Sequence, residues 1–66
     1  MQAMIDPQKV RDLREAKSMS TRQLAREAGV STETIYSLEH GKRQPSVTTL
    51  TKLALALRVE VKDFFS

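Results

Sequence analysis

Signals for starting a helix recur at short intervals along this chain, and they constrain its fold more than any other feature of the sequence. A side chain that accepts hydrogen bonds from the free amides of a first turn is typical of a helix start. Four such starts can be identified: Asp6 before Pro7, Ser20 with Gln23 in the capping-box spacing, Ser31, and Ser46.

Signals for ending a helix follow the second and third of these starts. Gly29 and Gly41 can adopt the left-handed conformation that closes a helix. Only Gly29 and Val30 lie between the second helix and the Ser31 cap, and so short a turn favours the steep crossing of a helix-turn-helix. The predicted helices cover residues 7–17, 21–28, 32–40, 47–57 and, as a last short helix, 61–65, with Ser18 in the first turn.

Apolar residues follow the three-and-four spacing of helices with one buried face. No strand-length window alternates apolar and polar residues, and no internal repeat is present. We therefore predict an all-α bundle of five helices forming one domain over residues 1–66. Its expected core includes Val10, Leu13, Leu24, Ala25, Ala28, Ile35, Leu38, Val47, Leu50, Leu53, Ala54 and Leu57.

Composition excludes most catalytic designs. The chain has no cysteine and one histidine, His40, so disulfides, thiolate metal sites and multi-histidine sites are excluded. We predict no enzyme, no catalytic residues, no cofactor and no metal. The longest apolar run, residues 53–57, is far shorter than the roughly 20 residues that span a bilayer, so we expect a soluble cytoplasmic protein that binds no membrane.

Net charge is a weak guide to the partner. The formal charge is +3, but the excess is spread evenly along the chain, so bulk charge cannot support a nucleic-acid interface. Any such prediction must depend on where individual cations lie relative to helix ends.

The helix over residues 32–40 presents a polar face opposite its buried Ile35 and Leu38. A solvated surface is the simpler interpretation of such a face. Its neighbours favour another one, because two helix amino ends and the Lys42–Arg43 pair lie around it, and these groups attract phosphate. A polar helix between phosphate contacts fits the major groove. The face consists of Thr32, Glu33, Tyr36, Ser37 and His40, with Thr34 near its boundary.

Residues 10–57 resemble the helix-turn-helix domain of the Cro/cI-type repressors, also called the xenobiotic-response-element family, which includes phage repressors and restriction-modification controllers. The resemblance implies a lambda-repressor-like bundle of five helices that binds operator DNA as a twofold dimer through its third helix. The residues that carry it are 13–17, Ser20, Leu24-Ala25, residues 28–31, Ile35, Leu38-Glu39, residues 41–43, Pro45-Ser46, Leu50 and Leu53-Ala54.

The resemblance also implies residue roles. Arg14 and Glu39 are expected to form an ion pair between the first and third helices. The expected base-reading residues are Thr32, Glu33 and Ser37, with Thr34 and Tyr36 beside them. The expected phosphate-binding residues are Thr21, Arg22, Ser31, Lys42 and Arg43.

Three residues depart from the family pattern. Thr21 replaces a frequent glutamine, which weakens the prediction of that contact. Ser18 and Arg58 stand where glycine commonly ends a helix, so either these turns differ from the family's or they cost about 1 kcal/mol each.

A dimer contact is expected at the C-terminus, at Val61, Phe64 and Phe65, with Leu55 and Arg58 as further candidates. One phenylalanine would complete the core and the other would form the contact; alternatively, both are core residues.

The leading hypothesis is a sequence-specific transcriptional regulator that binds a palindromic double-stranded DNA operator as a homodimer, without a small-molecule effector. The alternative is a protein-interaction module, such as an antitoxin or a coactivator, that uses the same fold.

Overall fold

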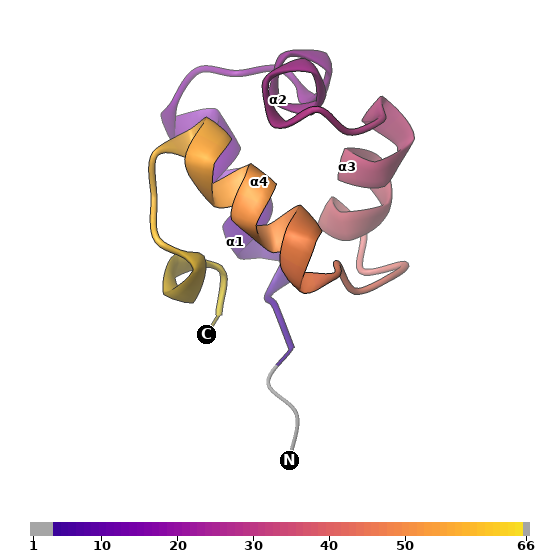
Figure 1. Cartoon of the computed structure of the whole chain (residues 1–66). Helices are drawn as coiled ribbons and strands as arrows, with labels where there is room; N and C mark the ends of the chain where they lie inside the picture. The colour runs from indigo at the N-terminus through magenta and orange to yellow at the C-terminus, as the bar shows by residue number, and fades with distance from the viewer. Residues whose placement is uncertain (1–3, 66) are drawn as a thin grey trace.

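The structure is a computed structural model that describes residues 4–65 (Figure 1). Within this part of the chain the only strand-like pairing is one isolated bridge between Ile5 and Phe65, so the predicted all-helical class is confirmed. None of the helices in this range has the length and apolar character needed to cross a membrane. The elements are α1 (Pro7–Ala16), α2 (Thr21–Ala28), α3 (Thr32–Glu39), α4 (Val47–Leu57) and the 3-10 helix η1 (Val61–Phe64).

The prediction of five α-helices is wrong at the C-terminus, where η1 is a single 3-10 turn. Its bonds span three residues: the Phe65 amide donates to the Lys62 carbonyl, and the Asp63 amide to that of Glu60. A segment of four residues is too short to support an α-helical hydrogen-bond ladder, whereas 3-10 bonding suits such short pieces. The described chain therefore has four α-helices and one 3-10 turn.

Every α-helix begins at its predicted cap. The Ser20 Oγ accepts from the Gln23 amide at 3.0 Å while the Gln23 side chain accepts from the Ser20 amide at 2.8 Å, which completes the capping box. Ser31 and Ser46 each accept from the amide three residues later, at 3.0 and 3.1 Å. Asp6 accepts from the Gln8 amide at 3.0 Å. These bonds satisfy amides that have no partner inside the helix.

Two helix ends adopt a strained backbone. Ser18 and Arg58 have φ values of 57° and 58°, in the left-handed region where a Cβ atom is disfavoured. Gly29, which ends α2 at φ 72°, meets the same requirement without that cost. The turns after α1 and α4 therefore keep the left-handed conformation without glycine.

The core lies where α1, α2, α3 and α4 converge, with α4 in front of α1, α2 across one end and α3 at the side (Figure 1). Most predicted core residues are buried, but Val47 is not. It occupies the first position of α4 and is 80% exposed, so the first turn of α4 extends past the core. The buried residues are Ile5, Val10, Leu24, Ala25, Ala28, Ile35, Leu38, Leu50, Leu53, Ala54, Leu57 and Phe64.

The two ends of the described chain pair with each other. The Asp6 amide donates to the Phe64 carbonyl at 2.8 Å, beside the Ile5–Phe65 bridge. Phe64 has no exposed surface and Phe65 is half-buried against the core. Both phenylalanines thus pack inward, which corrects the prediction that Phe64 forms a dimer contact: burial on its own core leaves it no surface for a partner.

Candidate nucleic-acid interface

The expected ion pair between Arg14 and Glu39 is present and joins α1 to α3. The Arg14 Nε and Nη2 atoms donate to the two carboxylate oxygens of Glu39 at 2.7 and 3.0 Å. A third donor, Nη1, reaches the Met19 carbonyl at 2.8 Å. The two side chains are only 11% and 3% exposed, and the hydrogen bond with Glu39 raises the pKa of Arg14 above its ordinary value. Together with the buried Ile35 and Leu38, this bidentate pair restrains the rotation of α3 about its own axis.

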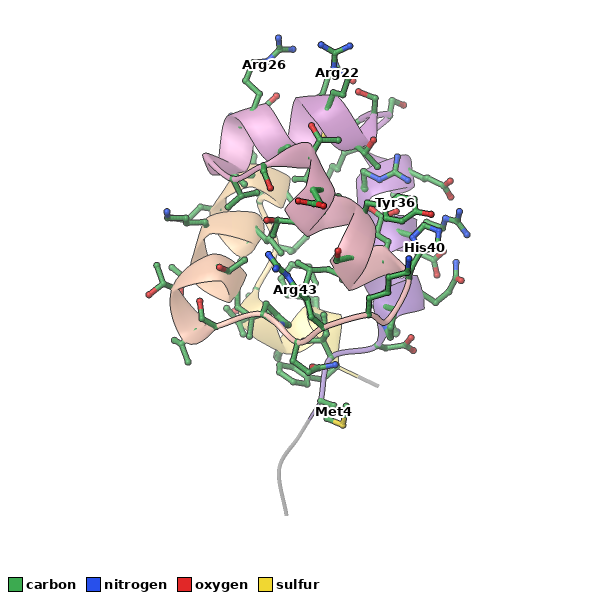
Figure 2. All side chains as sticks on the ribbon, turned by 90° about the vertical axis from the view of Figure 1, so that its right-hand side faces the viewer. Met4, Arg22, Arg26, Tyr36, His40 and Arg43 are labelled. Carbon is green, nitrogen blue, oxygen red and sulfur yellow. The ribbon has the colours of Figure 1, made fainter. Side chains whose placement is uncertain are left out.

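With α3 held in this way, its polar face looks outward. Ile35 and Leu38 are fully buried, whereas Thr32, Glu33 and Tyr36 are exposed and Ser37 is half-buried. Figure 2 views the molecule from this side, with α3 nearest the viewer. The helix therefore presents a row of hydrogen-bonding groups to solvent, as the sequence predicts.

A chain of hydrogen bonds runs from the loop after α3 to the amino end of that helix. The Arg43 Nη2 donates to the Thr34 Oγ1 at 3.0 Å, and that oxygen lies 2.8 Å from the Ser31 Oγ, which caps α3. Figure 2 shows Arg43 beside α3. The structure thus places a predicted phosphate-binding residue, Arg43, in contact with a predicted base-reading residue, Thr34.

A second cluster lies at the carboxyl end of α3. The Tyr36 and His40 rings stack with centroids 3.9 Å apart and an interplanar angle of 23°. The Lys42 Nζ lies 5.3 Å from the centroid of the Tyr36 ring. Tyr36 and Lys42 thus lie against each other. A predicted base-reading residue and a predicted phosphate-binding residue therefore share one surface.

The amino end of α2 contributes Thr21, which is half-buried, and Arg22, which is exposed. Figure 2 shows Arg22 and Arg26 projecting in the same direction from α2. Sequence reasoning missed Arg26, although its i+4 spacing from Arg22 is a signal for a shared face.

The loop that carries Lys42 and Arg43 is tied to the N-terminal segment. The Gln44 Oε1 accepts from the Ile5 amide at 3.1 Å, across 39 residues of sequence. The Lys42 amide also donates to the Ser37 carbonyl at 2.9 Å. Gln44 was missed as well, and no local signal could have found it, because its partner is distant in sequence.

The candidate dimer residues differ in exposure. Val61 is 36% exposed and Leu55 is 74% exposed, whereas Phe65 is half-buried. Among residues 4–65 there is no group of three His, Asp or Glu side chains that could hold a metal ion. The arrangement around α3 offers cations, hydroxyls and helix-end amides, a set suited to an anionic polymer with polar base edges.

The chain matches the model of the Helix-turn-helix family (HTH_3) over residues 10–64. It is 38% identical over 60 residues to the uncharacterized HTH-type transcriptional regulator RghRB of Bacillus subtilis, covering 89% of this chain and 43% of that protein. An uncharacterized HTH-type transcriptional regulator of Archaeoglobus fulgidus is 35% identical over 57 residues, covering 86% and 81% of the two chains. The chain thus spans about two fifths of RghRB and four fifths of the Archaeoglobus relative.

Solved structures agree with this match. The restriction-modification controller protein C.AhdI from Aeromonas hydrophila superimposes with a TM-score of 0.86 at 36% identity, covering 89% of both chains. SinR of Bacillus subtilis, solved in complex with DNA, gives 0.84 at 30% identity, covering 88% of this chain and 97% of that one. The DNA-binding domain of the P22 C2 repressor, at 22% identity and a TM-score of 0.83, shares the fold and covers 94% and 82% of the chains.

Proposed function

Because this chain belongs to the helix-turn-helix family of transcriptional regulators, we propose that it binds a palindromic DNA operator as a homodimer, with α3 in the major groove. One observation carries the proposal. The polar face of α3 is held outward by the buried Arg14–Glu39 pair, and cations lie at both ends of that face.

The exposed face of α3 supplies the proposed base-reading groups. The carboxylate of Glu33 only accepts hydrogen bonds, which suits the amino group of cytosine. The methyl groups of Thr32 and Thr34 suit the methyl group of thymine, and the Ser37 hydroxyl both donates and accepts. Tyr36, stacked on His40, lies at the edge of this set.

The proposed phosphate contacts surround this set. Similarity to SinR, solved in complex with DNA, supports DNA as the partner. The free amides at a helix start attract phosphate, so the amino ends of α2 and α3 are proposed to contact the duplex backbone. Thr21, Arg22 and Ser31 lie at those ends, and Lys42 and Arg43 follow α3. The hydrogen bond between Arg43 and Thr34 joins a proposed phosphate-binding residue to a proposed base-reading residue. Arg43 therefore lies where the two proposed groups of residues meet.

The homodimer is proposed because a single domain of this size covers about 600–1,000 Å² of DNA and discriminates poorly by itself. A twofold dimer doubles the contacts and matches half-sites about 10 base pairs, or a multiple of that distance, apart. Val61 and Leu55 are exposed apolar residues in the C-terminal part of the described chain, and their exposure supports a contact between two copies.

Selection of bound duplexes from a random pool tests the proposal. The enriched sites should share an inverted repeat, and affinity for a synthetic version should exceed that for scrambled duplex by about 10³-fold or more. Affinity should also fall steeply with salt. Failure to enrich any sequence, together with a weak salt dependence, would instead favour a protein-interaction module such as an antitoxin.

Two variants separate the proposed roles. Glu33→Ala should relax preference at one operator position by about 1–3 kcal/mol and leave the salt slope nearly unchanged. Lys42→Ala should weaken all duplexes alike and reduce the salt slope by about one. An exchange of these two outcomes would show that the residue roles are assigned wrongly.

A further inference from the structure

His40 is the only histidine of the chain. One of its two ring nitrogens, Nδ1, is engaged in a hydrogen bond within the protein. Its Nδ1 lies 2.8 Å from the Tyr36 carbonyl oxygen. A carbonyl oxygen only accepts hydrogen bonds, so Nδ1 must carry a proton. The other ring nitrogen, Nε2, makes no hydrogen bond to any residue in the range 4–65 and lies on the side of the ring away from that carbonyl.

The orientation of the ring is also fixed. Tyr36 stacks on it at 3.9 Å, and Lys42 lies over the Tyr36 ring. Figure 2 shows Tyr36 and His40 side by side along one flank of α3. Two contacts, one in the plane of the imidazole and one on its face, therefore determine where Nε2 is presented.

His40 lies on the proposed DNA-binding face. Glu33, Tyr36 and His40 follow one another at spacings of three and four residues, so they form one stripe on the helix. All three side chains are exposed. His40 ends this stripe beside Lys42, one of the proposed phosphate-binding residues.

We propose that His40 contacts a DNA phosphate through Nε2, and that it does so only in its protonated form, so that operator binding takes up a proton. The inference depends on the proposed function. In the neutral ring the Nδ1 proton leaves Nε2 with a lone pair, which repels a phosphate oxygen. In the cation Nε2 donates a charge-assisted hydrogen bond to phosphate while Nδ1 still donates to Tyr36.

The basic groups near His40 come from the loop after α3 and from α1. Lys42 from the loop lies on the neighbouring Tyr36 ring. Two residues of α1 contact the end of α3: the Pro7 side chain lies beside Gly41, and Arg14 donates to Glu39. Arg11 lies between Pro7 and Arg14 on the same face of α1, so it faces the same end of α3.

The acidic groups near His40 come from α3 and α1. Glu39 is neutralised by Arg14. Glu33 lies two turns away from His40 on the stripe, and Glu15 lies one turn beyond Arg11 on α1. The carboxyl end of α3 favours a cation modestly. A phosphate placed against Nε2 adds the negative charge that shifts the balance to the protonated ring.

The test measures operator affinity at constant ionic strength from about pH 6 to pH 8, the range in which a histidine ordinarily titrates. The dissociation constant of the wild-type protein should rise with pH by up to about tenfold per pH unit for each bound protomer, as expected for one linked proton. His40→Gln, which keeps a neutral donor, should bind with little dependence on pH. His40→Lys should bind tightly across the whole range, because its charge is permanent there.

Calorimetry gives a second readout. Binding enthalpies measured in two buffers of different ionisation enthalpy should report an uptake of up to about one proton per protomer near pH 7 for the wild type, and almost none for His40→Gln. The α-amino group titrates near this range, and it is unchanged in the variant, so the difference isolates His40. Operator binding that is equally pH-dependent in the wild type and His40→Gln, or independent of pH in both, would overturn the proposal for His40. The proposed function would not be affected by that result. Failure of the wild type to bind any duplex selectively would overturn the proposed function as well.

Discussion

Arg14 and Glu39 link α1 to α3 beside the buried Ile35 and Leu38, and each satisfies the charge of the other in a largely buried position. Removing one charge leaves the other uncompensated, which costs more than the pair itself contributes. The pKa of Arg14 is raised by its hydrogen bond with Glu39. While Glu39 is a carboxylate, the stabilising contribution is therefore fully present below the unfolded-state pKa of Arg14 and is lost as pH rises through the folded value.

Glu39→Gln should lower the free energy of unfolding by about 3 kcal/mol or more, because Arg14 keeps its charge without a counter-ion. That is a large fraction of the roughly 3–10 kcal/mol typical of a chain of this length. Urea unfolding followed by circular dichroism measures the loss. The difference between the wild type and the variant should stay constant between about pH 7 and pH 10.

The exposed pair Lys62–Glu60 is the matched control. Its charged atoms lie 3.2 Å apart, but the side chains are 79% and 73% exposed. Glu60→Gln should leave stability nearly unchanged, since water screens such a pair. Equal effects of the two substitutions would contradict the role assigned to Arg14 and Glu39.

Arg58 and Gly29 test the cost of left-handed backbone. Arg58→Gly should stabilise the protein by up to about 1 kcal/mol, since glycine adopts φ 58° without steric penalty. Gly29→Ala should destabilise it by about 1 kcal/mol through backbone strain alone, because a Cβ at Gly29 would meet nothing within 4 Å. Thermal unfolding should show opposite shifts of several degrees. Shifts of the same sign in both variants would refute this explanation.

At the scale of elements, the amino end of α3 combines a structural role and a proposed binding role. Ser31 caps the helix through its Oγ, and both aspartate and asparagine cap helices about as well as serine. Ser31→Asp should therefore keep the stability of the fold but weaken binding to every duplex, because it places a negative charge against phosphate.

Ser31→Asn is the control, since it caps without charge. Its DNA affinity should remain close to that of the wild type, and unfolding experiments should show similar stability for both variants. If Ser31→Asp binds DNA as well as Ser31→Asn does, the amino end of α3 does not contact the backbone.

The helix boundaries could be predicted from the sequence because they depend on local bonds. The Ser20–Gln23 capping box joins residues only three positions apart. The left-handed conformation at Gly29 is available because glycine has no Cβ. The C-terminal turn could not be assigned correctly in this way. The segment 61–64 is too short for an α-helical ladder, and its end is fixed by the pairing of the Phe64 carbonyl with the Asp6 amide, a tertiary contact that the sequence does not reveal.

The candidate site shows the same division. The outward face of α3 follows from helical spacing, since Ile35 and Leu38 define its buried side. The contacts between distant residues do not follow from spacing. The Gln44–Ile5 bond and the Arg43–Thr34 bond join a loop to other elements, and side-chain rotamers determine both.

At the scale of the whole molecule, the proposed dimer depends on exposed apolar residues near the C-terminal end. Val61→Lys should weaken self-association, because it places a charge in an apolar contact, and should thereby lower operator affinity more at low protein concentration than at high. Sedimentation velocity and binding isotherms at several concentrations measure both effects.

Val47→Lys is the control for the added charge, since it makes the same substitution at an exposed position, the first of α4, outside the proposed contact. It should leave self-association unchanged. Equal association of the wild type and Val61→Lys would remove Val61 from the dimer contact and leave Leu55 as the residue to test.

The central claim is that α3 enters the major groove, and an NMR titration of the labelled wild-type protein with its selected operator tests it most directly. We predict that the largest amide shift changes fall at Thr32 to His40, with smaller changes at Arg22 and Lys42, while amides at the middle of α4 stay nearly unmoved. Large changes confined to α4 or η1, with the amides of α3 unchanged, would contradict the account.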